Sequence, residues 1–207
     1  MTSLYHFYHV YADGKWEEAA DEHITALQQH GLADALDGMY LGIVGNETNR
    51  SNVKTYFTDR GVDYYTRVDA PLGWEQVTLD SLQRHMIVND GYVLYAHTKG
   101  SYNDTPINIG WRSSMCYHNV VRWEEAISHL DNVDTVGCHW VNGNIWGGNY
   151  WWATGRHIRT LKPLQYSDRW KAELWIGQRE EIEGLDKIKI HDLNPGWPDP
   201  QLFTTSW

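Results

Sequence analysis

Apolar residues in the first half of the chain form short continuous runs that alternate with stretches of helical spacing. The run at residues 4–11 predicts a buried strand, and a turn-like Ala12-Asp13-Gly14 follows it. Trp16, Ala20, Ile24 and Leu27 then recur at intervals of three or four residues, which predicts a helix. The chain therefore begins with a strand, a turn and a helix.

The same alternation continues to residue 96. The pattern predicts strands at residues 39–44, 64–68 and 92–96, a polar helix at about 49–59, and a helix with Leu79, Leu82 and Met86 on one face. Alternating strands and helices are typical of a mainly parallel sheet with helices on both faces. The predicted fold class is therefore α/β, with a mixed, mostly parallel sheet.

A long amphipathic helix is the clearest feature of the second half. It is predicted from a buried stripe at three, four and seven residue spacing, made of Ile109, Cys116, Val120, Trp123, Ile127 and Leu130. Further strands are predicted at residues 134–141 and, more briefly, 150–153. A helix around 168–177 and a proline-rich tail at 194–207 complete the chain. We expect residues 1–207 to form a single domain, since domains commonly span about 100–200 residues.

Composition and charge narrow the function classes. The 12 Trp and 13 Tyr against 3 Phe make the aromatic content amphipathic, which suits contact with sugars as well as a core. A net charge of -10 disfavours a surface that neutralises nucleic-acid phosphates, although a nucleic acid stays open as an acceptor. Cys116 and Cys138 lie in apolar segments and indicate buried thiols in a reducing cytoplasm. No signal peptide or membrane span is expected, since no apolar run approaches about 20 residues.

The strand at residues 92–96 ends in His97-Thr98-Lys99, a cluster of hydrogen-bond donors with one fixed positive charge. Ligands of open α/β sheets bind beyond the carboxyl ends of the strands. Arg112, in the first turns of the next helix, could reach the same anion, for which a guanidinium group is well suited. The alternative is that Lys99 and Arg112 are ordinary solvated charges.

A second cluster combines glycines, an amide and indoles at residues 147–153. Gly148, Asn149, Trp151 and Trp152 are therefore candidates for contacts with a sugar and an acceptor. Neighbouring residues of a strand point to opposite faces, so at most one of the two tryptophans can face a cleft.

Five segments in order resemble a family of small glycosyltransferases of the GT-A fold, which is related to the Rossmann fold. The resemblance is greatest to the amino-terminal glycosyltransferase domain encoded by chlorella viruses and to its bacterial and phage relatives. It spans nearly the whole chain and depends on Tyr95-Ala96-His97-Thr98-Lys99-Gly100, Trp111-Arg112 with Met115, Gly137-Cys138-His139-Trp140, Gly148-Asn149-Tyr150-Trp151-Trp152-Ala153 and Glu173-Leu174-Trp175-Ile176-Gly177.

The resemblance implies transfer of a sugar from a nucleotide-diphosphate donor, first of all a UDP-sugar, to a hydroxyl acceptor on a glycan or another biomolecule. It places the nucleotide in about residues 1–105 and the acceptor in about 106–207. By the same resemblance, Val10, Tyr11 and Asp13 would line the nucleoside pocket and Asp69 would accept a hydrogen bond from the base. The alternative is that Tyr11 is a core residue and that the two loop carboxylates form turns or caps.

The chain departs from the general GT-A pattern at the position where relatives carry an Asp-x-Asp pair that holds a divalent cation. His97-Thr98-Lys99 stands there instead, so Lys99 and Arg112 could neutralise the leaving diphosphate without a metal. Alternatively, His97 with His191 or Asp192 could hold Mn²⁺ or Mg²⁺.

The acceptor side needs a general base if transfer inverts the sugar. Glu173 occupies the place where many inverting relatives carry this base, with Asp168 in reserve and an exposed helical acid as the alternative reading. A non-catalytic carbohydrate-binding module is the rival function, although such modules are typically all-β. A glycoside hydrolase ranks last, because no pair of facing carboxylates is evident near residues 147–153.

Overall fold

In the part of the chain that the structure describes, seven strands form one sheet in the order β3-β2-β1-β4-β8-β5-β9, and β6 pairs with β7 in a separate hairpin. The computed structural model describes residues 2–103, 105–179 and 187–195. The strands are β1 (Leu4–Tyr11), β2 (Gly38–Val44), β3 (Tyr65–Ala70), β4 (Tyr92–His97), β5 (Thr135–Gly137), β6 (Trp140–Val141), β7 (Ile145–Trp146), β8 (Trp151–Thr154) and β9 (Ile190–Asp192). Within the large sheet, β8 runs antiparallel to its neighbours β4 and β5, and the other pairings are parallel.

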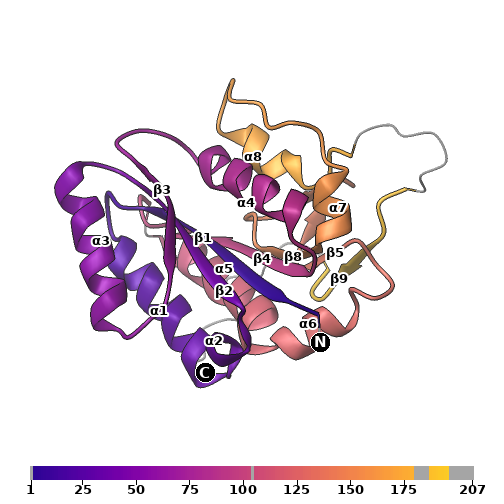
Figure 1. Ribbon diagram of the computed structural model, residues 1–207, viewed down its shortest axis with the longest axis horizontal. Coiled ribbons are helices and arrows are strands. Elements are labelled where there is room, and N and C mark those ends of the chain that lie inside the picture. Colours follow the sequence, from indigo (N-terminus) through magenta and orange to yellow (C-terminus); the bar gives the residue numbers. More distant parts are fainter. Residues whose placement is uncertain (1, 104, 180–186, 196–207) are drawn as a thin grey trace.

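Helices cover both faces of the sheet, as Figure 1 shows. One face packs against α4, α7 and α8, and the other packs against the remaining helices. The helices are α1 (Trp16–Gln29), α2 (Leu32–Ala35), α3 (Glu47–Asp59), α4 (Gln76–Val88), α5 (Pro106–Cys116), α6 (Trp123–Ser128), α7 (Gly155–Arg159) and α8 (Trp170–Trp175), with the π-helical turn η1 (Tyr117–Val121) between α5 and α6. None of the helices in the described ranges is long and apolar enough to cross a membrane.

The elements up to β4 match the sequence prediction to within a few residues, apart from the short helix α2, which the pattern does not predict. Strands β1, β2 and β4 are covered on both sides and appear in the sequence as continuous apolar runs, whereas β3 lies at the edge of the sheet and is largely exposed. Local capping fixes where the helices begin: the side chain of Asn46 accepts a hydrogen bond from the Asn49 N–H at the start of α3, and Thr105 does the same for Asn108 in α5.

The second half departs from the prediction in several places, among them the short elements β7 and α7, which the pattern does not predict. The single helix expected through residues 109–130 is interrupted by η1, and Ile109 of its expected buried stripe is 37% exposed. The strand expected at 134–141 stops at Gly137, because His139 adopts a left-handed φ of 66°. Strand β9, which the sequence pattern did not reveal, pairs in parallel with β5. Residues 196–207 of the expected tail lie outside the described residues.

Buried histidines form a hydrogen-bonded chain through the core. His6 Nδ1 lies 3.2 Å from the carbonyl oxygen of Leu94, which can only accept, so this nitrogen carries the proton. His6 Nε2 must then accept from His23 Nε2 at 2.7 Å, and His23 Nδ1 accepts from the Tyr150 hydroxyl at 3.0 Å. Each of the three hydrogen bonds thus contains one proton, so both imidazoles are neutral.

This chain of neutral histidines predicts acid sensitivity. Burial lowers the pKa of His6 from 6.5 to about 4, so the unfolded chain binds more protons between these pH values and stability falls as the pH drops through that window. One such group contributes about 3 kcal/mol. Urea unfolding at pH 7 and pH 4.5 should show a smaller loss in His6→Gln than in the wild type. The exposed control His30→Gln should lose as much stability as the wild type; equal losses in all three proteins would contradict the prediction.

Candidate active site

The carboxyl ends of β1, β2, β3 and β4 meet at one edge of the sheet. The parallel register aligns Tyr11 with Val44, Val44 with Ala70, and His9 with His97. Strand β8 runs the other way and pairs Trp151 with Tyr95, so the residues just before it reach the same edge. This edge is where ligands of such sheets bind.

The residues predicted for the nucleoside pocket differ in their accessibility. Val10 is fully buried within β1, so its side chain belongs to the core and cannot line a pocket, which corrects the prediction. Tyr11 is partly exposed, and its backbone N–H donates to the Thr98 hydroxyl at 3.0 Å. Asp13 Oδ1 accepts hydrogen bonds from Asn46 and Asn49, which ties the end of β1 to the turn before α3.

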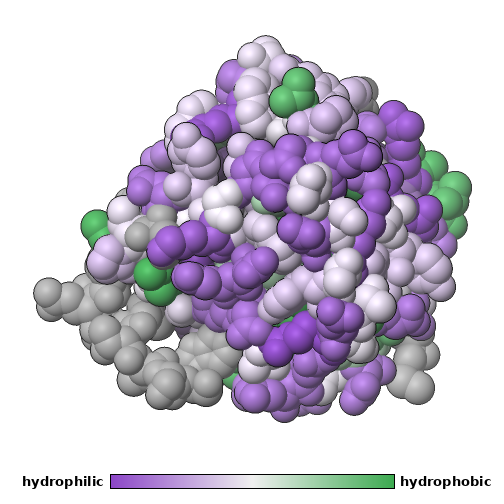
Figure 2. Space-filling model, turned by 90° about the vertical axis from the view of Figure 1, so that its left-hand side faces the viewer, coloured by the Kyte–Doolittle hydropathy of each residue, from purple (hydrophilic) through white to green (hydrophobic). Residues whose placement is uncertain are grey.

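Asp69 forms ion pairs with two cations from α3, Arg50 at 3.0 Å and Lys54. Its carboxylate therefore already has partners, and a nucleobase would share it with them. The molecular face beside α3 is mainly hydrophilic, with hydrophobic residues only as isolated spots (Figure 2). A polar ligand fits this face better than an apolar partner.

Arg112 contacts the backbone of Lys99, but the two cations differ in their ion pairing. Arg112 is paired with Glu22, whereas Lys99 forms no ion pair with a described residue. Arg112 is 6% exposed, donates from Nε to Glu22 at 2.6 Å, and donates from Nη1 to the carbonyl oxygen of Lys99 at 3.1 Å. Its charge is therefore balanced by Glu22, and its role is to hold the Lys99 loop. The Lys99 ammonium lies 4.6 Å from the centre of the Trp111 ring, an aromatic face that attracts a cation without neutralising it.

His97 donates from Nε2 to the carbonyl oxygen of Gly148 at 2.8 Å. Burial and then the nearby Lys99 charge lower its pKa to about 4, so the imidazole is neutral at pH 7. Thr98 is 4% exposed and holds Tyr11, as described above. Both side chains therefore shape the strand end rather than add charge to it.

The turn before β8 is built around two residues with positive φ, Gly148 at 81° and Asn149 at 56°. A Cβ on Gly148 would lie 2.5 Å from the sulfur of Met115, so only glycine fits there. Asn149 is fully buried; its amide donates to Glu75 at 2.7 Å, and its oxygen accepts from the Trp151 indole. The predicted sugar contact by Asn149 is corrected to a positioning role.

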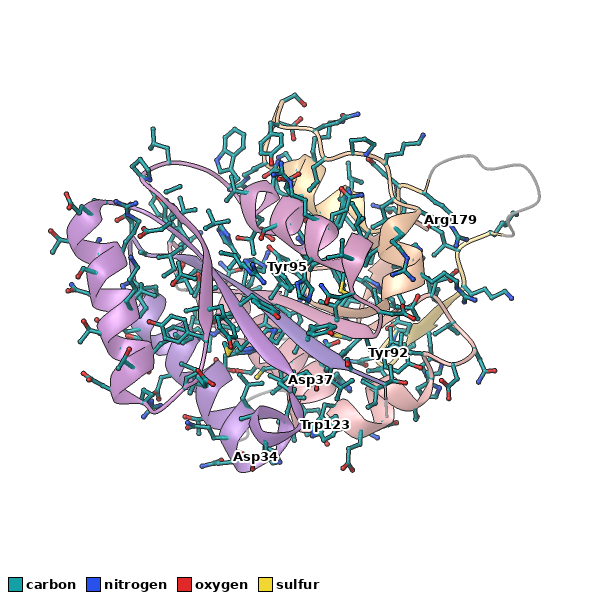
Figure 3. The ribbon with its side chains drawn as sticks, viewed as in Figure 1. Asp34, Asp37, Tyr92, Tyr95, Trp123 and Arg179 are labelled. Atoms are coloured by element: carbon teal, nitrogen blue, oxygen red, sulfur yellow. The ribbon has the colours of Figure 1, made fainter. Side chains whose placement is uncertain are left out.

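Glu75, which the sequence analysis does not identify, connects three residues at this edge of the sheet. Its Oε2 accepts from the Tyr95 hydroxyl at 3.0 Å and from Asn149, and its Oε1 lies 3.7 Å from His97 Nδ1. Tyr95 lies near the centre of the molecule (Figure 3), on the sheet face that α4 covers. Glu75 immediately precedes α4, where an acidic residue is commonplace, so spacing alone gave no signal.

Glu173 of α8 belongs to the same electrostatic neighbourhood. Burial raises its pKa above 4.5, the positive charge of Lys99 lowers it, and the negative charge of Glu75 raises it again. Asp168, the reserve base, instead precedes α8 and accepts a hydrogen bond from the Trp170 N–H at 2.9 Å, and its carbonyl oxygen accepts from Gln76. Of the two predicted carboxylates, Glu173 is therefore the one that interacts electrostatically with Lys99.

Both tryptophans of the predicted sugar site lie in the core. Trp151 and Trp152 point to opposite faces, as expected, but each is fully buried. Strand β8 lies between β4 and β5, and helices cover both of its faces, so neither indole reaches a ligand. The prediction that one of them contacts a sugar is wrong.

The predicted metal pair is also separated. His97 lies on β4 and His191 on β9, with β8 and β5 between them, which places them roughly 14 Å apart. His191 stacks on His129, and the carboxylate of Asp192 accepts from two backbone N–H groups. Within the described residues, no three His, Cys, Asp or Glu side chains are placed to hold a metal ion. The residues therefore do not fit the divalent cation that the Asp-x-Asp pattern would hold.

Taken together, the edge combines the partly exposed Lys99 with two partly buried carboxylates that interact electrostatically, Glu75 and Glu173. A cation can stabilise negative charge on a leaving group, and a carboxylate with a raised pKa can accept a proton from an incoming hydroxyl.

Comparison with known proteins gives the fold and a family. The model of one protein family, described as a domain of unknown function (DUF8361), matches residues 7–193. A search of the curated proteins found no match. Among solved structures, the chain resembles a protein of Desulfovibrio desulfuricans G20 provisionally assigned as a nucleotide-diphospho-sugar transferase, at 12% identity and a TM-score of 0.52 over 94% of this chain and 81% of that one. This likeness and the sheet order confirm the predicted α/β, GT-A-like fold.

Two further structures are more distant and support no argument. One is 4-diphosphocytidyl-2C-methyl-D-erythritol synthase of Anaerococcus prevotii DSM 20548, at 8% identity and a TM-score of 0.48 over 92% of this chain and 89% of that one. The other is a manganese complex of Rv0371c of Mycobacterium tuberculosis H37Rv, at 12% identity and a TM-score of 0.47 over 100% and 95%.

Proposed function

We propose that this chain, which belongs to the DUF8361 family, is a glycosyltransferase that moves a sugar from a nucleoside-diphosphate donor to a hydroxyl acceptor. The observation that carries the proposal is the electrostatic interaction between Lys99, at the end of β4, and the partly buried carboxylate of Glu173. The fold shared with a nucleotide-diphospho-sugar transferase supports it. A UDP-sugar is the first candidate donor, and a glycan is the first candidate acceptor.

In the proposed reaction, the bond between the anomeric carbon and the diphosphate oxygen breaks, and its electron pair stays on the diphosphate. Lys99 neutralises that charge as it grows. Glu173 takes the proton from the acceptor hydroxyl, whose oxygen then bonds to the anomeric carbon with inversion. The products are the glycoside, the nucleoside diphosphate and a protonated Glu173, which releases its proton to solvent.

The supporting residues have structural tasks in this proposal. Glu75 aligns Tyr95 and Asn149, Arg112 fixes the Lys99 loop, and the partly exposed Tyr11 with Asp13 and Asp69 borders the nucleoside. We place the reaction in the cytoplasm, since the two cysteines are buried free thiols.

Thermal unfolding with nucleotides tests the proposal. At a UDP concentration about 100-fold above Kd, binding should add about 2.7 kcal/mol and raise Tm by roughly 5–10 °C. GDP and dTDP serve as donor alternatives, and free hexoses as the control. A Tm that rises only with free sugars would favour a non-catalytic carbohydrate-binding module, and no response to any diphosphate would refute the proposal.

A further inference from the structure

Two exposed tryptophans flank the carboxylates of the active site. Trp74, which directly precedes Glu75, is 49% exposed, and Trp170 is 54% exposed. Trp170 lies three residues before Glu173 in α8, a spacing that puts both on one side of the helix. An accessible indole thus lies in each of the two segments that carry the carboxylates.

The segments that carry these indoles are fastened to each other. Gln76, fully buried at the start of α4, donates from Nε2 to the carbonyl oxygen of Asp168 at 2.6 Å. In return, the hydroxyl of Tyr166 donates to the carbonyl oxygen of Gln76 at 3.4 Å. Tyr166 is itself 54% exposed, so a third aromatic ring stands at the same junction. The three rings come from two segments, yet their backbones are held in a fixed relation.

The chemistry of this junction selects a neutral, hydroxyl-rich ligand. The Arg169 guanidinium lies 4.5 Å from the centre of the Trp170 ring, so it covers part of the indole. Exposed indole faces bind the apolar C–H faces of pyranose rings, while carboxylates accept hydrogen bonds from their hydroxyls. Once a donor diphosphate is paired with Lys99, the carboxylate of Glu173 disfavours an acceptor that brings a second phosphate to it.

We infer that Trp74, Tyr166 and Trp170 form the acceptor subsite and bind a neutral oligosaccharide. The inference rests on the proposed function, because it takes the neighbourhood of Lys99 and Glu173 as the place of reaction. The subsite replaces the role that the sequence suggested for Trp151 and Trp152. It brings the acceptor hydroxyl next to Glu173, where deprotonation is needed.

Titration calorimetry with maltohexaose, cellohexaose and chitohexaose, each in the presence of UDP, tests the inference. We expect at least one of them to bind the wild type, and Trp74→Ala and Trp170→Ala to weaken that binding about tenfold or more. Trp170→Phe, which keeps an aromatic face, should recover part of the loss. Tyr65→Ala is the matched control, since Tyr65 is 60% exposed at the opposite, amino end of β3.

The outcomes separate the two proposals. If the wild type binds UDP but none of the three oligosaccharides, or if the tryptophan variants bind them as Tyr65→Ala does, the acceptor subsite is refuted and the transferase remains. If UDP fails to bind while the tryptophan variants lose oligosaccharide binding, the transferase proposal falls instead. Unchanged UDP affinity in Trp74→Ala and Trp170→Ala is the expected internal check.

Discussion

Replacing Lys99 with alanine is expected to lower kcat for sugar transfer by about 10²- to 10³-fold. The Lys99 ammonium forms no ion pair with a described residue, and its charge acts electrostatically on Glu173. Arg112 cannot replace it, because Glu22 already compensates the guanidinium. Steady-state kinetics with a UDP-sugar and a saturating acceptor measure the effect.

Two further lysine variants make this result specific. Lys99→Met keeps most of the aliphatic stem against Trp111 but removes the charge, so it should be as inactive as Lys99→Ala. The exposed Lys162, on the segment that leads to α8, is the control, and Lys162→Ala should keep wild-type kinetics. Full activity in Lys99→Met would reject charge neutralisation by this residue.

Glu173→Gln is expected to reduce kcat by about 10²- to 10⁴-fold while UDP binding stays unchanged. Glutamine keeps the shape of the side chain but cannot take the proton of the acceptor hydroxyl. Because burial raises the pKa of Glu173, the activity of the wild type should fall on acidification at a pH above 4.5, as the base becomes protonated. In Lys99→Met, the loss of the positive charge should move this fall to a still higher pH.

Asp168→Asn is the matched control for the base, since it removes the reserve carboxylate and leaves Glu173 in place. This variant should keep transfer, although it weakens the hydrogen bond from the Trp170 N–H. A Glu173→Gln enzyme that turns over at the wild-type rate, or an Asp168→Asn enzyme that is inactive but folded, would overturn the assignment.

The sequence predicts an element of this fold where the residues that define the element lie close together in the chain. Strands β1, β2 and β4 are continuous apolar runs, and apolar residues recur at helical spacing in the helices between them. The pattern near each residue is therefore sufficient to predict these elements. Strand β9 joins the sheet beside β5 from more than fifty residues away, and its three residues carry no periodic signal. The interruption of the helix at η1 also lacks a proline or glycine that would mark it.

The active site shows the same limit. Lys99 was evident because it ends a strand, and the resemblance to glycosyltransferases pointed to Glu173. Glu75 reaches the site only because α4 begins beside the end of β4, which no spacing in the chain reveals. Trp151 and Trp152 had the right chemistry for a sugar, but their place in a central strand buries both.

A crystal structure of the protein with UDP tests the central claim most directly. The account predicts that the diphosphate lies at the carboxyl edge of the sheet, within ion-pair distance of the Lys99 ammonium and beside Glu173. UDP bound at any other place, with Lys99 still on Trp111 and without a contact to phosphate, would contradict it.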